Sequence, residues 1–311
     1  MEKKALVSTI KSVVVVVKNL DESRRIFEEG LGLMCVGEAE TSAQTVGKLW
    51  QIGDGNFRCA RFARDGEDFG MIDLIENKNA AEPIRDKNCA FDYGIFTLNY
   101  RTNNLEKAVE KLRQCGAETV SETQSYNVGK PMLEVMMNLP SGERLTIIQI
   151  GDATDDAPFF REAIATAGMV VPQMSKAKEF YQNVLGLNVS ITFQATGSPF
   201  DKLLGAPDGT GLDFATLTSD GNWTGKVEFL ELFVPDKTGK DLSARTDLRH
   251  SGYFCLSFLT DDLNALYEKL KTADAEILCE PFLAERPFHT GKRAMFVRAS
   301  GGELVEFIEE K

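Results

Sequence analysis

Histidine and tryptophan are scarce in this 311-residue chain, and each occurs only twice. Because neutral imidazole is the commonest ligand for zinc, iron and copper in proteins, two histidines cannot supply a His-rich metal centre. The six cysteines are scattered and none belongs to a Cys-x-x-Cys pair, which excludes a zinc ribbon and indicates no disulfide framework. Six reduced thiols are typical of a cytoplasmic protein.

Basic residues are also in deficit. The chain has 35 Lys and Arg against 47 Asp and Glu, for a net charge of -12. This balance argues against nucleic acid and anionic membranes, since both partners need clustered basic side chains. The apolar run near the N-terminus is only five valines between Lys11-Ser12 and Lys18, so it predicts a buried strand rather than a signal peptide. The expected partner is a small molecule, and a homodimer is compatible with the sequence.

The chain contains an internal repeat. "IFEEGLGL" ends at Leu33 and "FYQNVLGL" ends at Leu187, and an offset of 154 also superposes Lys48-Leu49 on Lys202-Leu203. Further along, an offset of 158 aligns Leu105 with Leu263, and the runs that follow also match. The sequence is therefore two diverged copies of a unit of roughly 155 residues.

Each copy alternates strand and helix signals. A strand at "STIKSVVVVV", a helix at "LDESRRIFEEGLGL" and three short strands form a βαβββ module, and the pattern restarts at "YGIFTLNYR". The third module begins near "IATAGMVV" and the fourth at "GYFCLSFL", while "GDATDDAPFF" reads as the linker. The prediction is an α+β chain of four modules, paired into domains at 1–151 and 156–311.

These modules resemble the vicinal oxygen chelate superfamily, which includes glyoxalases, extradiol dioxygenases, epimerases and bleomycin-resistance proteins. The helices "LDESRRIFEEGLGL" and "DDLNALYEKLKTADA" carry the resemblance, which covers essentially the whole chain. It implies curved mixed sheets around cavities, and it implies metal ligands on the first and last strands of each module. It does not fix the chemistry, because one fold hosts many functions.

Transferring the ligand positions of the superfamily gives an unusual donor set. The first-strand positions are expected at Ser12, Thr97, Thr166 and Cys255, and the last-strand positions at Asp73, Thr146, Glu231 and Glu306. None is a histidine, so no metal site and no cofactor are predicted. A divalent metal at Glu231 and Glu306, with the Cys255 thiolate, is the less favoured alternative because soft sulfur beside hard carboxylates suits few metals.

Three residues are the candidate catalytic groups. Glu231 and Glu306 are expected among apolar neighbours, where a carboxylate is costly unless it is paired, bound or protonated. Such an acid has the raised pKa that proton transfer needs, although Lys226 or Arg298 could instead make them structural ion pairs. His289, in a loop beside Arg286 and Lys292, is the third candidate.

The C-terminal copy is also predicted to line the ligand cavity. It holds 14 of the 20 phenylalanines, which favours an aromatic pocket there. The expected ligand-binding residues are Tyr253, Cys255, Ser257, Phe229, Phe233 and Thr166.

The sequence thus predicts a glyoxalase-like protein that acts on a small aromatic or carbonyl-bearing molecule in a C-terminal cavity. If it is an enzyme, lyase or isomerase chemistry by carboxylate proton transfer fits better than a metal-dependent dioxygenase. The alternatives are a metal-free, resistance-type protein that sequesters its ligand, and a degenerate copy that serves only as an assembly partner.

Overall fold

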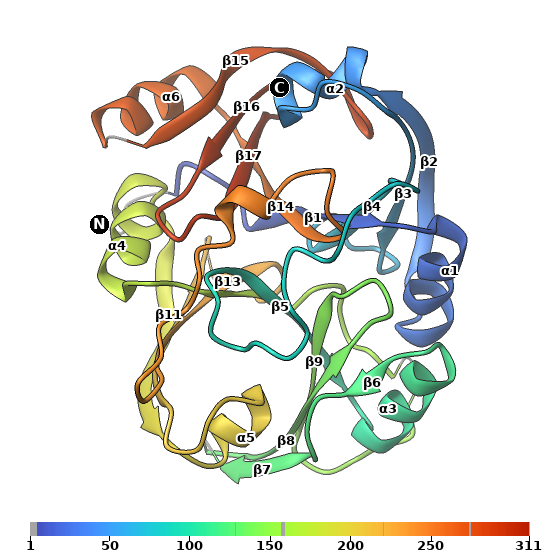
Figure 1. Cartoon of the computed structure of the whole chain (residues 1–311), viewed down its shortest axis with the longest axis vertical. Helices are drawn as coiled ribbons and strands as arrows, with labels where there is room; N and C mark the ends of the chain where they lie inside the picture. The colour runs from blue at the N-terminus through green and yellow to red at the C-terminus, as the bar shows by residue number, and fades with distance from the viewer. Residues whose placement is uncertain (1–4, 128, 157–158, 220, 274, 311) are drawn as a thin grey trace.

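The computed structural model describes residues 5–127, 129–156, 159–219, 221–273 and 275–310. The four expected modules are present (Figure 1). Module 1 comprises β1 (Ile10–Val17), α1 (Leu20–Arg25), the π-helical turn η1 (Ile26–Gly30), β2 (Met34–Ser42), α2 (Ala43–Trp50), β3 (Asn56–Ala63) and β4 (Met71–Glu76). Module 2 comprises β5 (Gly94–Thr102), α3 (Leu105–Gln114), β6 (Glu118–Thr119), β7 (Gln124–Asn127), β8 (Pro131–Asn138) and β9 (Arg144–Ile150).

The second half repeats this order. Module 3 comprises β10 (Thr166–Val170), α4 (Met174–Lys178), the π-helical turn η2 (Glu179–Val184), β11 (Asn188–Thr196), α5 (Phe200–Leu204), β12 (Gly211–Thr218) and β13 (Lys226–Phe233). A short 3-10 turn, η3 (Ser243–Arg245), precedes module 4, which comprises β14 (Gly252–Thr260), α6 (Leu263–Thr272), β15 (Glu276–Arg286), β16 (His289–Arg298) and β17 (Leu304–Glu309). None of these helices, within the described residues, is long and apolar enough to cross a membrane.

The repeated Leu-Gly-Leu motif marks the end of the first helix in each copy. Gly32 has a φ of 67° and Gly186 a φ of 84°, in the left-handed region that glycine enters at little cost. The motif therefore turns the chain from a helix into an edge strand, β2 or β11.

The two sheets do not follow the predicted domain boundary. One sheet has the order β15-β16-β17-β14-β1-β4-β3-β2, and the other has the order β11-β12-β13-β10-β5-β9-β8-β6, with β7 paired to β8. Module 1 thus pairs with module 4, and module 2 pairs with module 3. The division into 1–151 and 156–311 is corrected accordingly, because each sheet draws on both copies. Both sheets are mixed, since β1 is antiparallel to β14 and parallel to β4, and β10 is antiparallel to β5 and parallel to β13.

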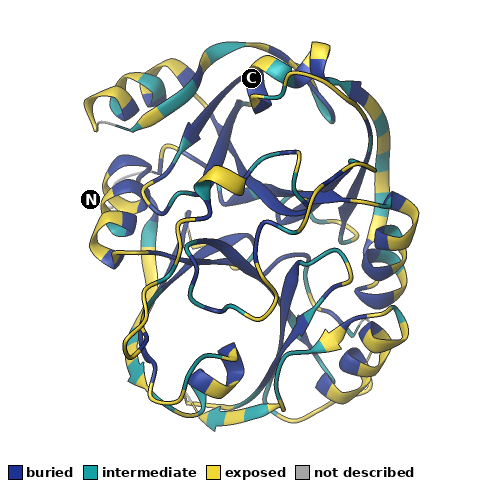
Figure 2. Cartoon of the chain, viewed as in Figure 1, coloured by how far each residue is buried: buried dark blue, intermediate teal, exposed yellow. Residues whose placement is uncertain are grey.

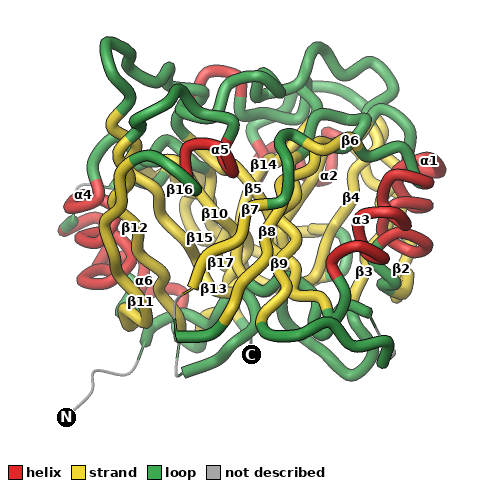
Figure 3. Tube along the Cα trace, turned by 90° about the horizontal axis from the view of Figure 1, so that it is seen from below, coloured by secondary structure: helices red, strands yellow, loops and turns green. Residues whose placement is uncertain are grey.

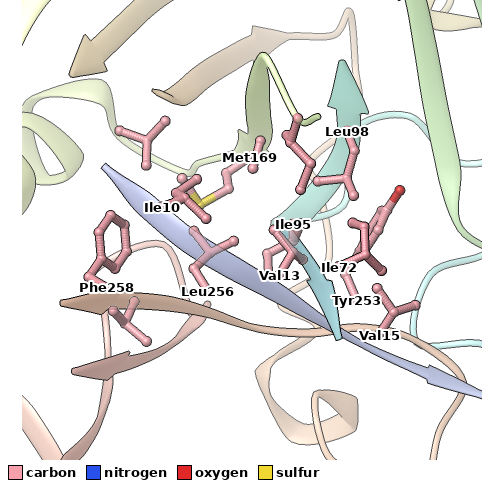
Figure 4. Packing of buried hydrophobic residues seen from close by; sticks show 14 of the residues in the cluster. Ile10, Val13, Val15, Ile72, Ile95, Leu98, Met169, Tyr253, Leu256 and Phe258 are labelled. Atoms are coloured by element: carbon pink, nitrogen blue, oxygen red, sulfur yellow. The ribbon is translucent and has the colours of Figure 1, made fainter. Parts of the chain in front are cut away.

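A shared apolar core joins the two sheets. Figure 4 shows Val13 and Val15 of β1 beside Ile95 and Leu98 of β5, with Met169 of β10 close by, all of them buried. In Figure 3 the strands form the middle of the molecule, with α1 and α3 at one side and α4 and α6 at the other. Figure 2 shows that the central strands are buried, whereas the edge strands β2 and β11 have many exposed residues.

The opposite face of each sheet curls around an interior of its own. In the β1–β14 sheet this interior is filled, because α2 inserts Val46, Leu49 and Trp50 among buried side chains of β14 and β16. In the β5–β10 sheet the corresponding helix α5 has five residues instead of eight, and it contributes the smaller Leu204 at the position of Trp50. The shorter helix leaves an open space in the second interior.

Candidate functional site

On the last strand of every module, two residues three positions apart point to opposite faces of the sheet. The first faces the interior, and the second reaches the start of a helix. The segments "DLIE", "TIIQ", "EFLE" and "EFIE" all end in an acid or amide that accepts a backbone N–H at the start of a helix. Glu76 accepts from Leu20, Gln149 from Leu105, Glu231 from Met174 and Glu309 from Leu263, at 2.7 to 3.2 Å. These four side chains satisfy helix N-terminal donors.

Glu231 is therefore a helix-capping residue, and the predicted last-strand position is corrected to Glu228. The first residues of the four segments, Asp73, Thr146, Glu228 and Glu306, point into the interiors instead. Asp73, Thr146 and Glu306 are thus the residues that were expected at these positions. On β13, the expected residue Glu231 lies three positions beyond the one that faces the interior.

Two of the four first-strand positions also need correction, each by two residues along the strand. Ser12 lies opposite Ser257, and Thr166 lies opposite Asn99, where β1 meets β14 and β10 meets β5. Asn99 and Ser257 thus replace the predicted Thr97 and Cys255. We define site I as Ser12, Asp73, Ser257 and Glu306, and site II as Asn99, Thr146, Thr166 and Glu228.

Site I is a closed cluster of ion pairs. Arg286 Nε lies 2.8 Å from Glu306 Oε2, and Arg286 Nη2 lies 2.9 Å from Asp73 Oδ2. The Ser257 hydroxyl donates to Glu306 at 2.7 Å, and the Ser12 hydroxyl donates to Asp73 at 2.9 Å. Both carboxylates are buried, so their pairing is what makes their burial tolerable.

Arg61 completes this cluster. Its Nε and Nη2 donate to the two oxygens of Asp73 at 2.6 and 2.8 Å, and Nη2 also lies 2.9 Å from His289 Nε2. Burial alone would raise the pKa of Asp73, but the charges of Arg61 and Arg286 outweigh it and hold that pKa well below its usual range. Burial and the two guanidinium groups lower the pKa of His289 to about 2, so its ring is neutral and accepts from Arg61.

Site II differs from site I in the donor to its buried carboxylate. The amide of Asn99 donates to Glu228, whereas the guanidinium of Arg286 donates to Glu306. Asn99 Nδ2 donates to Thr166 Oγ1 at 2.6 Å and to Glu228 Oε2 at 2.9 Å, and the Thr166 hydroxyl lies 3.1 Å from the same oxygen. Burial raises the pKa of Glu228, and the hydrogen bonds from Asn99 and Thr166, together with the charge of Lys226, offset part of that rise. In the sequence, the 158-residue offset aligns Arg286 with Val128, which lies outside the described residues.

Site II opens into a cavity of about 710 Å³, here called cavity II. One wall is a row of four aromatic rings in contact. The centroids of Tyr126 and Phe200 lie 5.2 Å apart and those of Phe200 and Phe193 5.4 Å, both pairs being tilted, and Phe193 stacks on Phe214 at 4.5 Å. The remaining walls are mostly apolar, with Arg101, Lys130, Trp223 and Lys226 also lining the cavity. A planar organic molecule fits such a lining.

A second carboxyl group lines cavity II beside Glu228. Glu134, on β8, accepts a hydrogen bond from the Tyr126 hydroxyl. Burial raises the pKa of Glu134 to about 7; the hydrogen bond from Tyr126 opposes this rise, and the charge of Glu228 adds to it. Near neutral pH Glu134 can therefore hold and release a proton.

The predicted site residues are divided among several environments. Glu306, Ser257 and His289 belong to or adjoin site I, and Thr166 belongs to site II. Phe229 and Tyr253 lie in the core between the sheets, Cys255 is buried beside site I, and Phe233 is 55% exposed. The predicted cavity within residues 156–311 is corrected as well, because cavity II is built from modules 2 and 3 and so joins both copies.

Sequence reasoning missed Asn99, Glu134, Glu228, Tyr126 and the two arginines of site I. The signal for Glu228 was present, because aligning "EFLE" with "EFIE" gives the correct position. Glu134 had no such signal, since the strand "EVMMN" shows no alternation that would indicate which face looks into a cavity.

The donor sets do not suit the metals of the resembled superfamily. Site I already balances two carboxylates with two guanidinium groups, and site II offers one carboxylate, two hydroxyls and an amide. Burial and the nearby Glu306 raise the pKa of Cys255 well above its ordinary value, which disfavours a thiolate ligand. Among the described residues, no group of three or more His, Cys, Asp or Glu is placed to hold a metal ion.

The fold consists of paired βαβββ modules that form two curved mixed sheets. Glyoxalase I from Zea mays has the same fold, with a TM-score of 0.66 and 15% identity over 97% of this chain and 92% of that one. A putative dioxygenase from Bacillus subtilis gives a TM-score of 0.64 and 14% identity over 99% of this chain and 86% of its own.

Residues 163–307 match the Glyoxalase/Bleomycin resistance protein/Dioxygenase superfamily. This match lies in the C-terminal copy, and the resemblance to the superfamily and the fold class predicted from the sequence are confirmed. No curated protein matches the sequence.

Proposed function

We propose that this chain binds a small aromatic or carbonyl-bearing molecule in cavity II and exchanges a proton with it through Glu134 and Glu228. The observation that carries the proposal is the pair of buried carboxyl groups in an apolar cavity with an aromatic wall. The reaction class is an isomerase or lyase type of proton transfer.

The two acids suit complementary roles. A carboxylate removes a proton from a carbon beside a carbonyl group, and a neutral carboxylic acid delivers one to another atom of the same molecule. Glu134 exists in both forms near neutral pH because its pKa is about 7. The aromatic rings of Tyr126, Phe200, Phe193 and Phe214 would pack against the plane of the ligand. The apolar walls would keep water from competing for the proton.

Binding is tested first with N-phenyl-1-naphthylamine, a neutral aromatic probe whose emission increases in apolar surroundings. The wild-type chain should give saturable emission, and Leu204→Trp should weaken it because the larger side chain would occupy part of cavity II. Trp50→Leu, at the corresponding position beside site I, is the matched control and should keep the binding at cavity II. Equal binding by the wild-type chain and Leu204→Trp would contradict this location.

Proton transfer is tested by exchange of the carbon-bound hydrogens of phenylacetone in deuterated water, followed by NMR. Glu228→Gln and Glu134→Gln should each lose most of the exchange above the buffer rate. Glu231→Gln should retain it, because Gln149 already shows that an amide serves as the helix cap at this position. Loss in all three variants would point to a general structural effect instead.

A metal-free binding protein is the second candidate. Both acids already have protein partners, since Glu134 accepts from Tyr126 and Glu228 accepts from Asn99 and Thr166. Saturable probe binding with no exchange above the buffer rate would favour this reading.

We also infer a cytoplasmic location, which the six free cysteines support. Fractionation of cells that express the tagged chain tests this inference, and recovery in a secreted or membrane fraction would contradict it.

A further inference from the structure

Arg286 lies at the centre of site I, and each of its three guanidinium nitrogens donates to an acceptor. Its Nε reaches Glu306, its Nη2 reaches Asp73 at 2.9 Å and Ser257 at 3.2 Å, and its Nη1 reaches the carbonyl of Pro287 at 2.8 Å. The side chain is 1% exposed. One guanidinium group thus contacts three of the four residues of site I.

Both oxygens of Glu306 are occupied. Oε2 accepts from Arg286 and Ser257, and Oε1 accepts from the indole N–H of Trp50 at 3.1 Å. The Arg286 guanidinium also lies over the Trp50 ring, 5.6 Å from its centroid. A metal ion would have to displace several of these contacts before it could reach the carboxylate.

The charges of the cluster also cancel. Arg61 and Arg286 carry two positive charges, and Asp73 and Glu306 carry two negative charges, while His289 is neutral. Adding a divalent cation to this buried and balanced set would leave two uncompensated charges in a medium of low dielectric constant.

We propose that Arg286 is a built-in counter-cation that takes the place of a metal ion between the last-strand acids of site I. Site I is then a structural ion cluster that binds no divalent metal. Removing the Arg286 side chain opens a cavity that is selective for a small guanidinium-type cation. This inference does not depend on ligand binding or catalysis in cavity II.

The test uses Trp50 as a reporter. Replacing Trp223 by Phe leaves Trp50 as the only tryptophan, since the chain has two. In this background, Arg286→Ala should have a lower Tm than its parent, and methylguanidinium at low concentration should raise that Tm while lowering the Tm of the parent. Sodium chloride at the same ionic strength controls for screening.

Two further variants make the rescue specific. The double variant Arg286→Ala, Glu306→Gln should show no rescue, because the acceptor charge is gone. Arg293→Ala removes a partly exposed arginine that pairs with Glu309 at 3.3 Å, and it should show no rescue either. A soluble Arg286→Ala chain that methylguanidinium does not stabilise would contradict the proposal.

Metal binding by the intact chain gives an independent answer if Arg286→Ala does not fold. Manganese, nickel and zinc titrations of the Trp223→Phe chain should cause no saturable change in Trp50 emission, and elemental analysis should find well under one equivalent of metal. Near-stoichiometric metal that disappears in Asp73→Asn or Glu306→Gln would overturn the proposal.

Discussion

Glu134 makes the stability of this protein depend on pH in a direction that can be worked out. Its pKa rises from 4.5 to about 7 on folding because the carboxyl group is buried, with a further contribution from the charge of Glu228. The folded chain therefore binds the proton more tightly than the unfolded chain does. The resulting stabilisation is complete below the unfolded pKa and is lost as pH rises through the folded pKa.

The size of this effect follows from the shift. A rise from 4.5 to about 7 corresponds to about 3 kcal/mol of unfolding free energy lost between pH 4 and pH 8. Glu134→Gln removes the titrating group, and its amide oxygen can still accept from Tyr126. We expect the unfolding free energy of the variant, relative to wild type, to increase by about that amount over the same pH range.

Urea unfolding at a series of pH values measures this difference. Glu143 is the matched control, because burial also raises its pKa to about 7 and it does not line cavity II. Glu143→Gln should flatten the pH dependence similarly but leave probe binding unchanged. Glu228→Gln should move the titration of Glu134 to lower pH, since it removes a neighbouring negative charge. Parallel curves for wild type and Glu134→Gln would refute the reasoning.

Three other predictions concern Glu231, Asp73 and Phe193. Glu231→Ala should cost about 1 kcal/mol of unfolding free energy because the N–H of Met174 loses its acceptor, and Glu231→Gln should cost almost nothing; urea unfolding compares the two. Asp73→Asn should cost about 3–5 kcal/mol, since Arg61 and Arg286 would share a neutral partner, and a thermal melt no lower than that of wild type would contradict this. Phe193→Ala should weaken binding of N-phenyl-1-naphthylamine because its ring stacks on Phe214, whereas Phe233→Ala, an exposed ring on β13, should not.

The fold was predictable because local signals agree along the chain. The valines of β1, the Leu-Gly-Leu ends of the first helices and the two sequence offsets all indicate the same module. The pairing of the modules was not predictable in this way. Modules 1 and 3 resemble each other, as do modules 2 and 4, so either first-type module presents a similar β-edge to either second-type partner. The choice depends on long-range packing that no short segment encodes.

The candidate site was predictable only where the repeat or the resemblance indicated a strand position. Thr166 was supported by its 154-residue offset from Ser12, whereas Asp73, Thr146 and Glu306 came from the last-strand ligand positions that the resemblance implied. Arg286 enters site I from the end of β15, a strand whose pairing with β16 is interrupted by three irregularities. Such bulges change which face a side chain occupies, so alternation along the sequence could not have placed this arginine.

The two interiors show how one architecture produces either a sealed cluster or an open cavity. In site I, Arg286 and Trp50 supply the donors that two buried carboxylates require, and the eight-residue α2 fills the remaining space. In site II, Glu228 has an amide and a hydroxyl as its donors, and Leu204 leaves room beside it. The charge of Lys226 offsets part of the cost of burying Glu228, but Glu228 makes no direct ion pair within the described residues, and a second acid nearby increases that cost. Placing both Glu134 and Glu228 on the wall of an apolar cavity has no packing advantage, and a bound molecule that donates a hydrogen bond or exchanges a proton would offset their cost.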